Sequence, residues 1–338
     1  MTRIPTRART AAGARTSHGE DSPLTESASL KAGSRTRPRI TTRAGGRRKL
    51  SPGRIIAWAV LASALVATLF PFYWMIRTAL TPAADLYSDS TGLVPDHPTM
   101  INFLRVLGLT SREEAVDAGG SGAQVDFLRY LLNSVVYSGL IASLQTLFCA
   151  MAGYAFARLR FPGRDAVFGV LIAALMVPPI FTLLPNFVLV KNLGWLNTFA
   201  GMVAPSVLMT PFAVFFLRQF FLSIPREVEE AAVLDGVGAW GIFWRVVLPM
   251  SRGPLITIGL TTTVWAWKDY LWPLLTGRDE ETRVLTVALG IFQQQSPNTQ
   301  PDWTGIMAGS ALSVLPVLVL LLLLGRRLVE SLNFTGIK

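Results

Sequence analysis

Residues 55–75 read IIAWAVLASALVATLFPFYWM, an uncharged run that Arg54 and Arg77 close at its two ends. A helix rises about 1.5 Å per residue and the hydrocarbon core of a bilayer is about 30 Å thick, so roughly 20 apolar residues are enough to cross it. This run is therefore expected to form a membrane-spanning helix.

Comparable apolar runs recur along the chain, at about residues 134–157, 166–190, 199–221, 256–275 and 306–324. Of the 338 residues, 51% are hydrophobic and only 15% are charged, which is outside the usual balance of a soluble domain. We expect an all-α polytopic membrane protein with six transmembrane helices.

The positive charge is concentrated in residues 1–50, which hold 12 Lys/Arg against 3 Asp/Glu and so supply nine of the ten net charges. This tail has almost no bulky apolar residues, so we expect a disordered cytoplasmic arm, followed by one transmembrane domain over 51–338. Its basic end, residues 47–49 with Arg54, lies where it can contact anionic membrane lipid. No aromatic residues alternate with the arginines, so a nucleic-acid partner is not expected.

The residue types that usually carry catalysis are scarce. Cys149 is the one cysteine, and His18 and His97 are the two histidines. A disulfide framework, a thiolate metal site and Ser-His or Cys-His catalysis are therefore not expected, and neither are catalytic residues or a bound metal.

Orientation follows from the positive residues in the short loops. Arginines flank or lie in the loops after the second, fourth and sixth runs: Arg158, Arg160, Arg164, Arg218, Arg226, Arg245, Arg252, Arg326 and Arg327. Cationic residues hold the cytoplasmic side, so both chain termini are expected in the cytoplasm of a bacterial or archaeal cell.

Prolines interrupt the third run. Pro178, Pro179 and Pro185 remove backbone donors and predict a kink or break there, and in no other run. The bend could line a transport pathway, or neighbouring helices could satisfy the freed groups. Both interpretations stay open.

The polar stretch between the fourth and fifth runs, about residues 223–252, predicts a helical hairpin. Pro225 suits a first helical turn, and the glutamates up to Glu230 suit the positive end of the helix dipole. Asp235-Gly236 should end this helix, because glycine accepts the left-handed conformation of a sharp turn. A second short helix should follow and end at Pro249.

Two faces of the hairpin are distinguishable. Val228, Ala231 and Ala232 lie at i, i+3, i+4 and form a shallow face beside Glu230. On the second helix an apolar face at i, i+3, i+4, i+7 should lie against the membrane domain: Trp240, Phe243, Trp244 and Val247. An amphipathic hairpin lying on the bilayer surface is the alternative.

The pattern Glu230-Ala231-Ala232, Gly236 and Leu248-Pro249 at these offsets resembles the permease subunits of binding-protein-dependent ABC importers. Val246 stands where isoleucine is typical of the family. Further stretches resemble its carbohydrate branch: Pro98-Thr99, Asn102-Phe103, Asn133-Ser134 and residues 193–198, 267–273 and 334–338. Lys268 replaces the more usual asparagine.

The resemblance implies a type I ABC importer permease fold and an assembly in which separate partners have separate roles. A second permease would complete the pathway, an extracytoplasmic solute-binding protein would deliver the cargo, and an ABC ATPase dimer would bind ATP. The chain has no phosphate-binding loop of its own, so no cofactor is expected on it. The family pattern assigns the ATPase contact to Glu230, Ala231 and Ala232, the turn to Asp235 and Gly236, and the end of the hairpin to Leu248 and Pro249.

Polar residues inside the apolar runs are candidates for the solute pathway, because their burial in a membrane is costly. The candidates are Asn133, Gln145, Asn186, Trp267 and Asp269. Hydrogen bonding between helices is the commoner use of such residues and stays open as the alternative.

The sequence therefore predicts a transporter subunit, with sugars as the expected cargo. Polyols, glycerol phosphate or another solute are the alternative cargo within the same class. An ion-coupled secondary transporter would need intramembrane ionisable pairs and repeated broken helices. A membrane-embedded enzyme would need the catalytic clusters that the histidine and cysteine counts disfavour.

Overall fold

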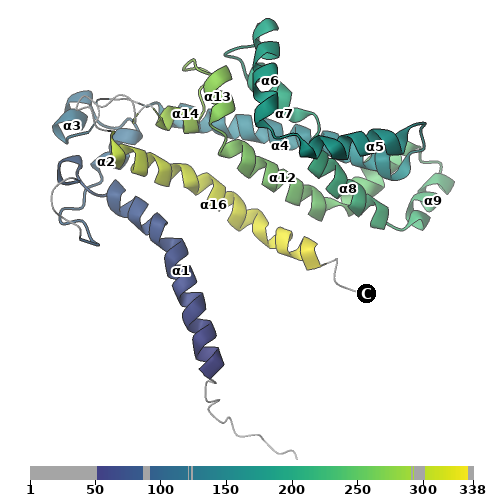
Figure 1. Ribbon diagram of the computed structural model, residues 1–338, viewed down its shortest axis with the longest axis horizontal. Helices are drawn as coiled ribbons and strands as arrows, with labels where there is room; N and C mark the ends of the chain where they lie inside the picture. The colour runs from purple at the N-terminus through teal and green to yellow at the C-terminus, as the bar shows by residue number, and fades with distance from the viewer. Residues whose placement is uncertain are drawn as a thin grey trace, which may run out of the picture. The chain divides into compact units, whose positions relative to one another are not determined.

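The computed structural model describes residues 52–86, 92–120, 122, 125–290, 292 and 301–333, and describes side chains up to residue 325. These residues form helices and turns and contain no strand (Figure 1). The predicted tail, residues 1–50, and the family-like end, residues 334–338, lie outside the described residues.

Three helices are long and apolar enough to cross a membrane without a break: α1 (Pro52–Ala79), α4 (Phe127–Arg158) and α16 (Trp303–Asn333). They match the first, second and sixth predicted spans. The helix α4 is central to the packing, because α7, α8, α12 and α14 all contact it.

The third predicted span is broken, as its prolines indicated. It consists of α5 (Arg164–Ala173) with the 3₁₀ turn η2 (Ala174–Met176), followed by α6 (Ile180–Asn192), and the chain bends by 105° between the two parts. Pro178 and Pro179 lie in the break, whereas Pro185 lies inside α6 without interrupting it.

The fourth predicted span is also broken, and the expectation that only the third would be is wrong. It comprises α7 (Phe199–Val207) and α8 (Pro211–Ser223), bent by 48°. Pro211 starts α8 and has no amide to continue the helical ladder. Two side chains of α4 bond backbone groups at the break: Gln145 Nε2 donates to Ser206 O at 2.5 Å, and the Thr210 amide donates to Cys149 Sγ at 3.4 Å.

The fifth predicted span, 256–275, has the wrong boundary. The helix α12 (Arg252–Trp267) ends after 16 residues, and a separate short helix, α13 (Leu271–Thr276), follows. Pro273 cannot donate to the carbonyl of Asp269, which the hydroxyl of Thr286 bonds instead at 2.8 Å. By length and composition, three helices can cross a membrane, or up to five when each bent pair counts as one span.

Short helices form the connections: η1 (Ala83–Asp85), α2 (Ile101–Val106), α3 (Arg112–Asp117) and α14 (Leu285–Leu289). Ser111 caps α3 with a reciprocal bond to Glu114. The amide of Leu285 bonds Ser134 Oγ at 2.8 Å, which fixes α14 to the first half of α4.

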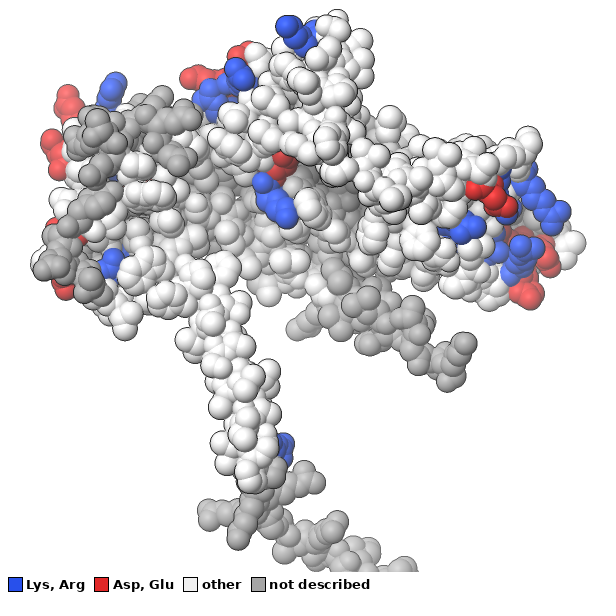
Figure 2. Space-filling view, in the orientation of Figure 1, with Lys and Arg blue, Asp and Glu red and all other residues white. Residues whose placement is uncertain are grey.

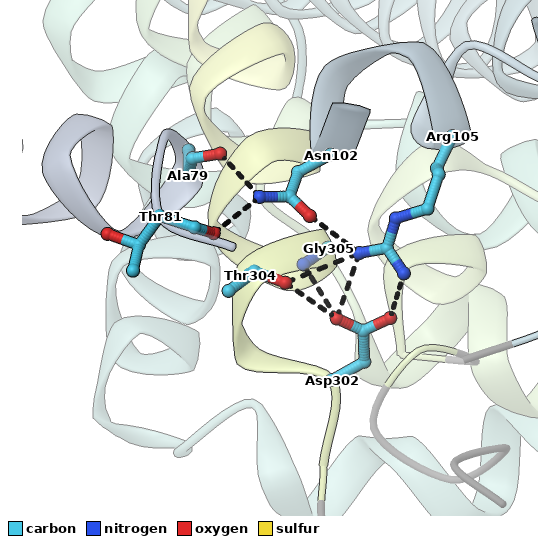
Figure 3. Close-up of polar contacts among 7 residues, drawn as sticks. All are labelled: Ala79, Thr81, Asn102, Arg105, Asp302, Thr304 and Gly305. Carbon is cyan, nitrogen blue, oxygen red and sulfur yellow. Dashed lines mark hydrogen bonds and ion pairs between the residues drawn. The ribbon is translucent and has the colours of Figure 1, made fainter. Parts of the chain in front are cut away.

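A buried polar network joins α2 to the start of α16 and the end of α1 (Figure 3). The Arg105 guanidinium meets the Asp302 carboxylate at 3.0 and 3.2 Å, and the two side chains are each 2% exposed. Asn102 accepts from Arg105 and donates to the carbonyls of Ala79 and Thr81 at 2.8 Å. Gly120 makes room, since a Cβ there would lie 1.1 Å from Arg105 Nη1.

Most charged side chains on the face that Figure 2 shows lie toward its edges, over α3 and over the short helix α9 (Arg226–Leu234), and a smaller group of both signs lies near its middle. This distribution fits helices whose middle parts lie in hydrocarbon and whose ends lie in water.

Candidate functional site

The polar stretch after α8 folds into the predicted hairpin. Its first helix, α9, follows Pro225 and ends at Asp235, and Gly236 has φ +79°. The Val237 amide bonds the Ala232 carbonyl at 2.9 Å across this turn. Glycine adopts the left-handed region without the Cβ clash that other residues meet, so the start and the turn of this helix agree with the sequence prediction.

The second half of the hairpin differs from the prediction in its internal geometry. It comprises α10 (Ala239–Ile242), η3 (Phe243–Val247), which is a π-helical turn, and α11 (Leu248–Met250). Pro249 lies in the first turn of α11, where proline is tolerated, and the chain turns two residues later. The prediction that Pro249 ends the helix is therefore wrong by one residue, and Ser251 marks the turn into α12.

Only half of the expected aromatic face is buried. Phe243 is 2% and Val247 0% exposed, whereas Trp240 and Trp244 are 65% and 49% exposed. A π-helical turn holds more residues than an α-helical turn, so the 3.6-residue spacing used for the prediction does not apply across η3. Ile242, 5% exposed, contributes to the buried face instead.

The buried side of the hairpin joins an apolar cluster with α4 and α8. The ring of Tyr154 on α4 lies 5.3 Å from that of Phe243 and 6.4 Å from that of Phe221, centroid to centroid. Gly153 allows close approach to α8, since a Cβ there would already lie 3.2 Å from Leu217 Cβ. The base of the hairpin is therefore attached to two long helices.

The opposite side of the hairpin is open. Glu230, Ala231, Asp235 and Gly236 are exposed, and Ala232 is half-buried. Beyond them, Val233 and Leu234 expose 58% and 89% of their surface. An acidic residue, small side chains and exposed apolar side chains thus share one short helix, a composition suited to seating in a partner's cleft.

The two adjacent glutamates of α9 have different surroundings. Glu229 Oε1 lies 2.8 Å from Arg158 Nε, and these side chains are 15% and 7% exposed. Glu230, one residue on, forms no ion pair with the part of the chain that is described. Sequence reasoning treated Arg158 as a marker of orientation and missed its pairing with Glu229.

Four of the five predicted pathway residues hydrogen-bond different parts of the protein. Asn133 Nδ2 bonds the carbonyls of Glu281 and Arg283, both at 2.9 Å, and Trp267 Nε1 bonds that of Ser313 at 3.2 Å. Gln145 accepts from Thr262 on α12 at 3.1 Å. Asp269 accepts from the hydroxyl of Tyr137 at 3.0 Å.

These contacts join helices and loops, which is the alternative use considered for such residues. Asn186 is half-buried on α6. Whether any of the five contacts a solute stays a prediction. Among the described residues, no group of three or more His, Cys, Asp and Glu side chains could hold a metal ion.

Comparison with known proteins decides the class. Residues 149–333, more than half of the chain, match the model of the family described as binding-protein-dependent transport system inner membrane component. The chain belongs to this family. It is thus a membrane permease subunit, and the all-α fold agrees with that membership.

Relatives extend the match over most of the permease. This chain is 30% identical to the probable ABC transporter permease YurM of Bacillus subtilis, over 86% of this chain and 91% of that one. It is 29% identical to the diacetylchitobiose uptake system permease NgcG of Streptomyces coelicolor, over 84% and 87%. A crystal structure of a bacterial ABC transporter that imports alginate shares the fold, with a TM-score of 0.67 at 20% identity, over 80% of this chain and 95% of that one.

Proposed function

We propose that this permease serves a sugar importer, forms the solute pathway with a second permease, and receives force from an ABC ATPase through the hairpin at residues 225–250. The exposed face of α9 carries the proposal. It presents Glu230 and Ala231 to solvent, while the other side of the hairpin is embedded among α4 and α8. A partner that pushes on this face pushes on the spans.

The proposed topology places both termini, the hairpin and the Arg158 end of α4 in the cytoplasm. The arginines after the second, fourth and sixth predicted spans support it. An extracytoplasmic solute-binding protein would then deliver cargo at the Phe127 end of α4, about 48 Å away for a 32-residue helix.

Sugars are the favoured cargo for two reasons. The relative NgcG is named as a permease for diacetylchitobiose uptake, and the alginate importer shares the fold. Polyols and glycerol phosphate remain the alternative. Reconstitution with the cognate binding protein tests this: a sugar should stimulate ATP hydrolysis and accumulate in proteoliposomes. Stimulation by glycerol phosphate but by none of a panel of mono- and oligosaccharides would reject the sugar assignment.

The coupling role is tested by Glu230→Leu in the assembled importer. Removing a charged contact at the centre of an interface should lower ATPase co-purification and solute uptake by roughly tenfold, equivalent to about 1.4 kcal/mol. Glu280→Leu is the matched control, because Glu280 is also exposed but lies in the loop that joins α13 to α14. Unchanged uptake and ATPase association in the Glu230 variant would contradict the role.

A further inference from the structure

The side chain of Arg158 meets three elements at once. Arg158 is the last residue of α4, and its Nε lies 2.8 Å from Glu229 Oε1 on α9. Its Nη2 donates to the Phe221 carbonyl in α8 at 2.7 Å and to the Ile224 carbonyl just beyond α8. One guanidinium therefore connects the ends of two long helices with the body of the hairpin's first helix.

The chemistry of this junction follows from helix ends. The last carbonyls of α8 have no partner within the helix and form the negative end of its dipole, where a cation is favourable. Arginine has five donors in a rigid fork, so it can bond these carbonyls and still face a carboxylate. Lysine has its three donors on one atom, so it would match this spread of acceptors less well than the planar guanidinium.

The ion pair is a polar contact between α9 and α4, although the 2.8 Å approach of Glu229 Oε1 and Arg158 Nε does not have the geometry of a hydrogen bond. None of the nine residues of α9 is buried, and only the half-buried Ala232 packs against the apolar cluster below. Glu229 and Arg158, by contrast, are both largely enclosed. Displacement of α9 can therefore reach α4 and the end of α8 through this pair, in addition to the apolar base of the hairpin.

The position of Glu229 relative to Glu230 suits transmission of movement from the outer face of α9 to Arg158. Successive residues of a helix point about 100° apart, so one glutamate faces inward while its neighbour faces outward. The outward face is the proposed ATPase contact, and the inward contact lies one residue away. Force applied by the ATPase at the outward face would therefore act on the inward Glu229 contact, one residue away.

We propose that the Arg158–Glu229 pair transmits movement of α9 to the ends of α4 and α8, so that ATP hydrolysis is converted into transport. The proposal rests on the proposed function of the hairpin. The two residues are positioning residues, because they act through the helices and do not contact nucleotide. Their loss should uncouple hydrolysis from transport without removing the ATPase.

The test uses the reconstituted importer with Glu229→Gln, Arg158→Met, and the double variant Arg158→Met/Glu229→Met. The readouts are ATPase co-purification, thermal stability, and the ratio of solute transported to ATP hydrolysed. We expect the ATPase to remain bound and the transport ratio to fall on the order of tenfold in all three. Glu280→Gln, at an exposed glutamate outside the hairpin, should leave the ratio unchanged.

The double variant separates transmission from simple stabilisation. Removing one partner leaves a charge unpaired, whereas removing both leaves no unpaired charge and should restore stability in part, since the carbonyls of Phe221 and Ile224 still lose the Arg158 donor. If the pair transmits movement, the double variant should recover stability in part while its ratio of solute transported to ATP hydrolysed stays low. A ratio that recovers together with stability would overturn the proposal.

Other outcomes are equally decisive. A normal transport ratio in the Glu229→Gln importer would overturn the proposal, and so would loss of the ATPase from a folded Glu229→Gln complex, since the pair would then serve docking. If the unmodified permease bound no ATPase at all, the proposed function itself would fail. The two failures are therefore distinguishable.

Discussion

Gly236 shows how one residue fixes the shape of the hairpin. Its φ of +79° is in the region that side chains with a Cβ disfavour, and a Cβ there would meet no atom within 4 Å. A substitution at Gly236 should therefore act through backbone conformation and not through steric overlap with a neighbour.

Gly236→Val should destabilise the hairpin by about 1–2 kcal/mol, because the left-handed conformation costs that much for a residue with a Cβ. Gly236→Asn should cost less, since asparagine tolerates this region. Hydrogen exchange of the α9 amides measures the local loss of stability. Gly238→Val is the control, because Gly238 also has open space but has φ −72°; equal effects at the two positions would contradict the explanation.

Single residues also show what sequence could predict. Pro225, Asp235 and Gly236 act through local rules of helix starts and ends, so the first helix of the hairpin was predictable. The pairs Arg158–Glu229 and Arg105–Asp302 join residues that are far apart in the chain. Without knowledge of the packing, Arg158 indicated only orientation and Arg105 had no assigned role, so both pairs were missed.

At the scale of elements, proline position explains most differences between prediction and structure. The prolines in the middle of the third span were recognised as a break. Pro211 and Pro273 were missed because each lies inside a long apolar run, and because side chains from other elements satisfy the backbone beside them. The extent of apolar sequence predicts a span, but the continuity of its helix depends on neighbours.

The junction of α1, α2 and α16 gives a prediction of its own. Asp302→Asn should destabilise the chain by about 3 kcal/mol, because Arg105 would keep its charge in a buried site without a carboxylate. Thermal unfolding in detergent or in bilayers measures this loss. Asp117→Asn on the exposed surface of α3 is the control, and a similarly small effect of both substitutions would contradict a structural role for the Arg105–Asp302 pair.

At the scale of the whole molecule, α4 links two specialised regions. Its first turns hold α14 and the loop before it through Ser134 and Asn133, and its last residue holds the hairpin through Arg158. A permease that couples ATP hydrolysis to solute passage needs such a connection between its two sides. The contacts of α4 with α7, α8 and α12 extend that connection to the broken and short helices around it.

The central claim is that the outer face of α9 contacts the ATPase, and site-specific cross-linking tests it most directly. Ala231→Cys places an exposed thiol beside Glu230, and Cys149→Ala removes the native buried thiol. A bifunctional thiol reagent applied to the assembled, ATP-hydrolysing importer should join residue 231 to the ATPase, and should not do so from Glu280→Cys. Efficient cross-linking from residue 280 with none from residue 231 would contradict the account.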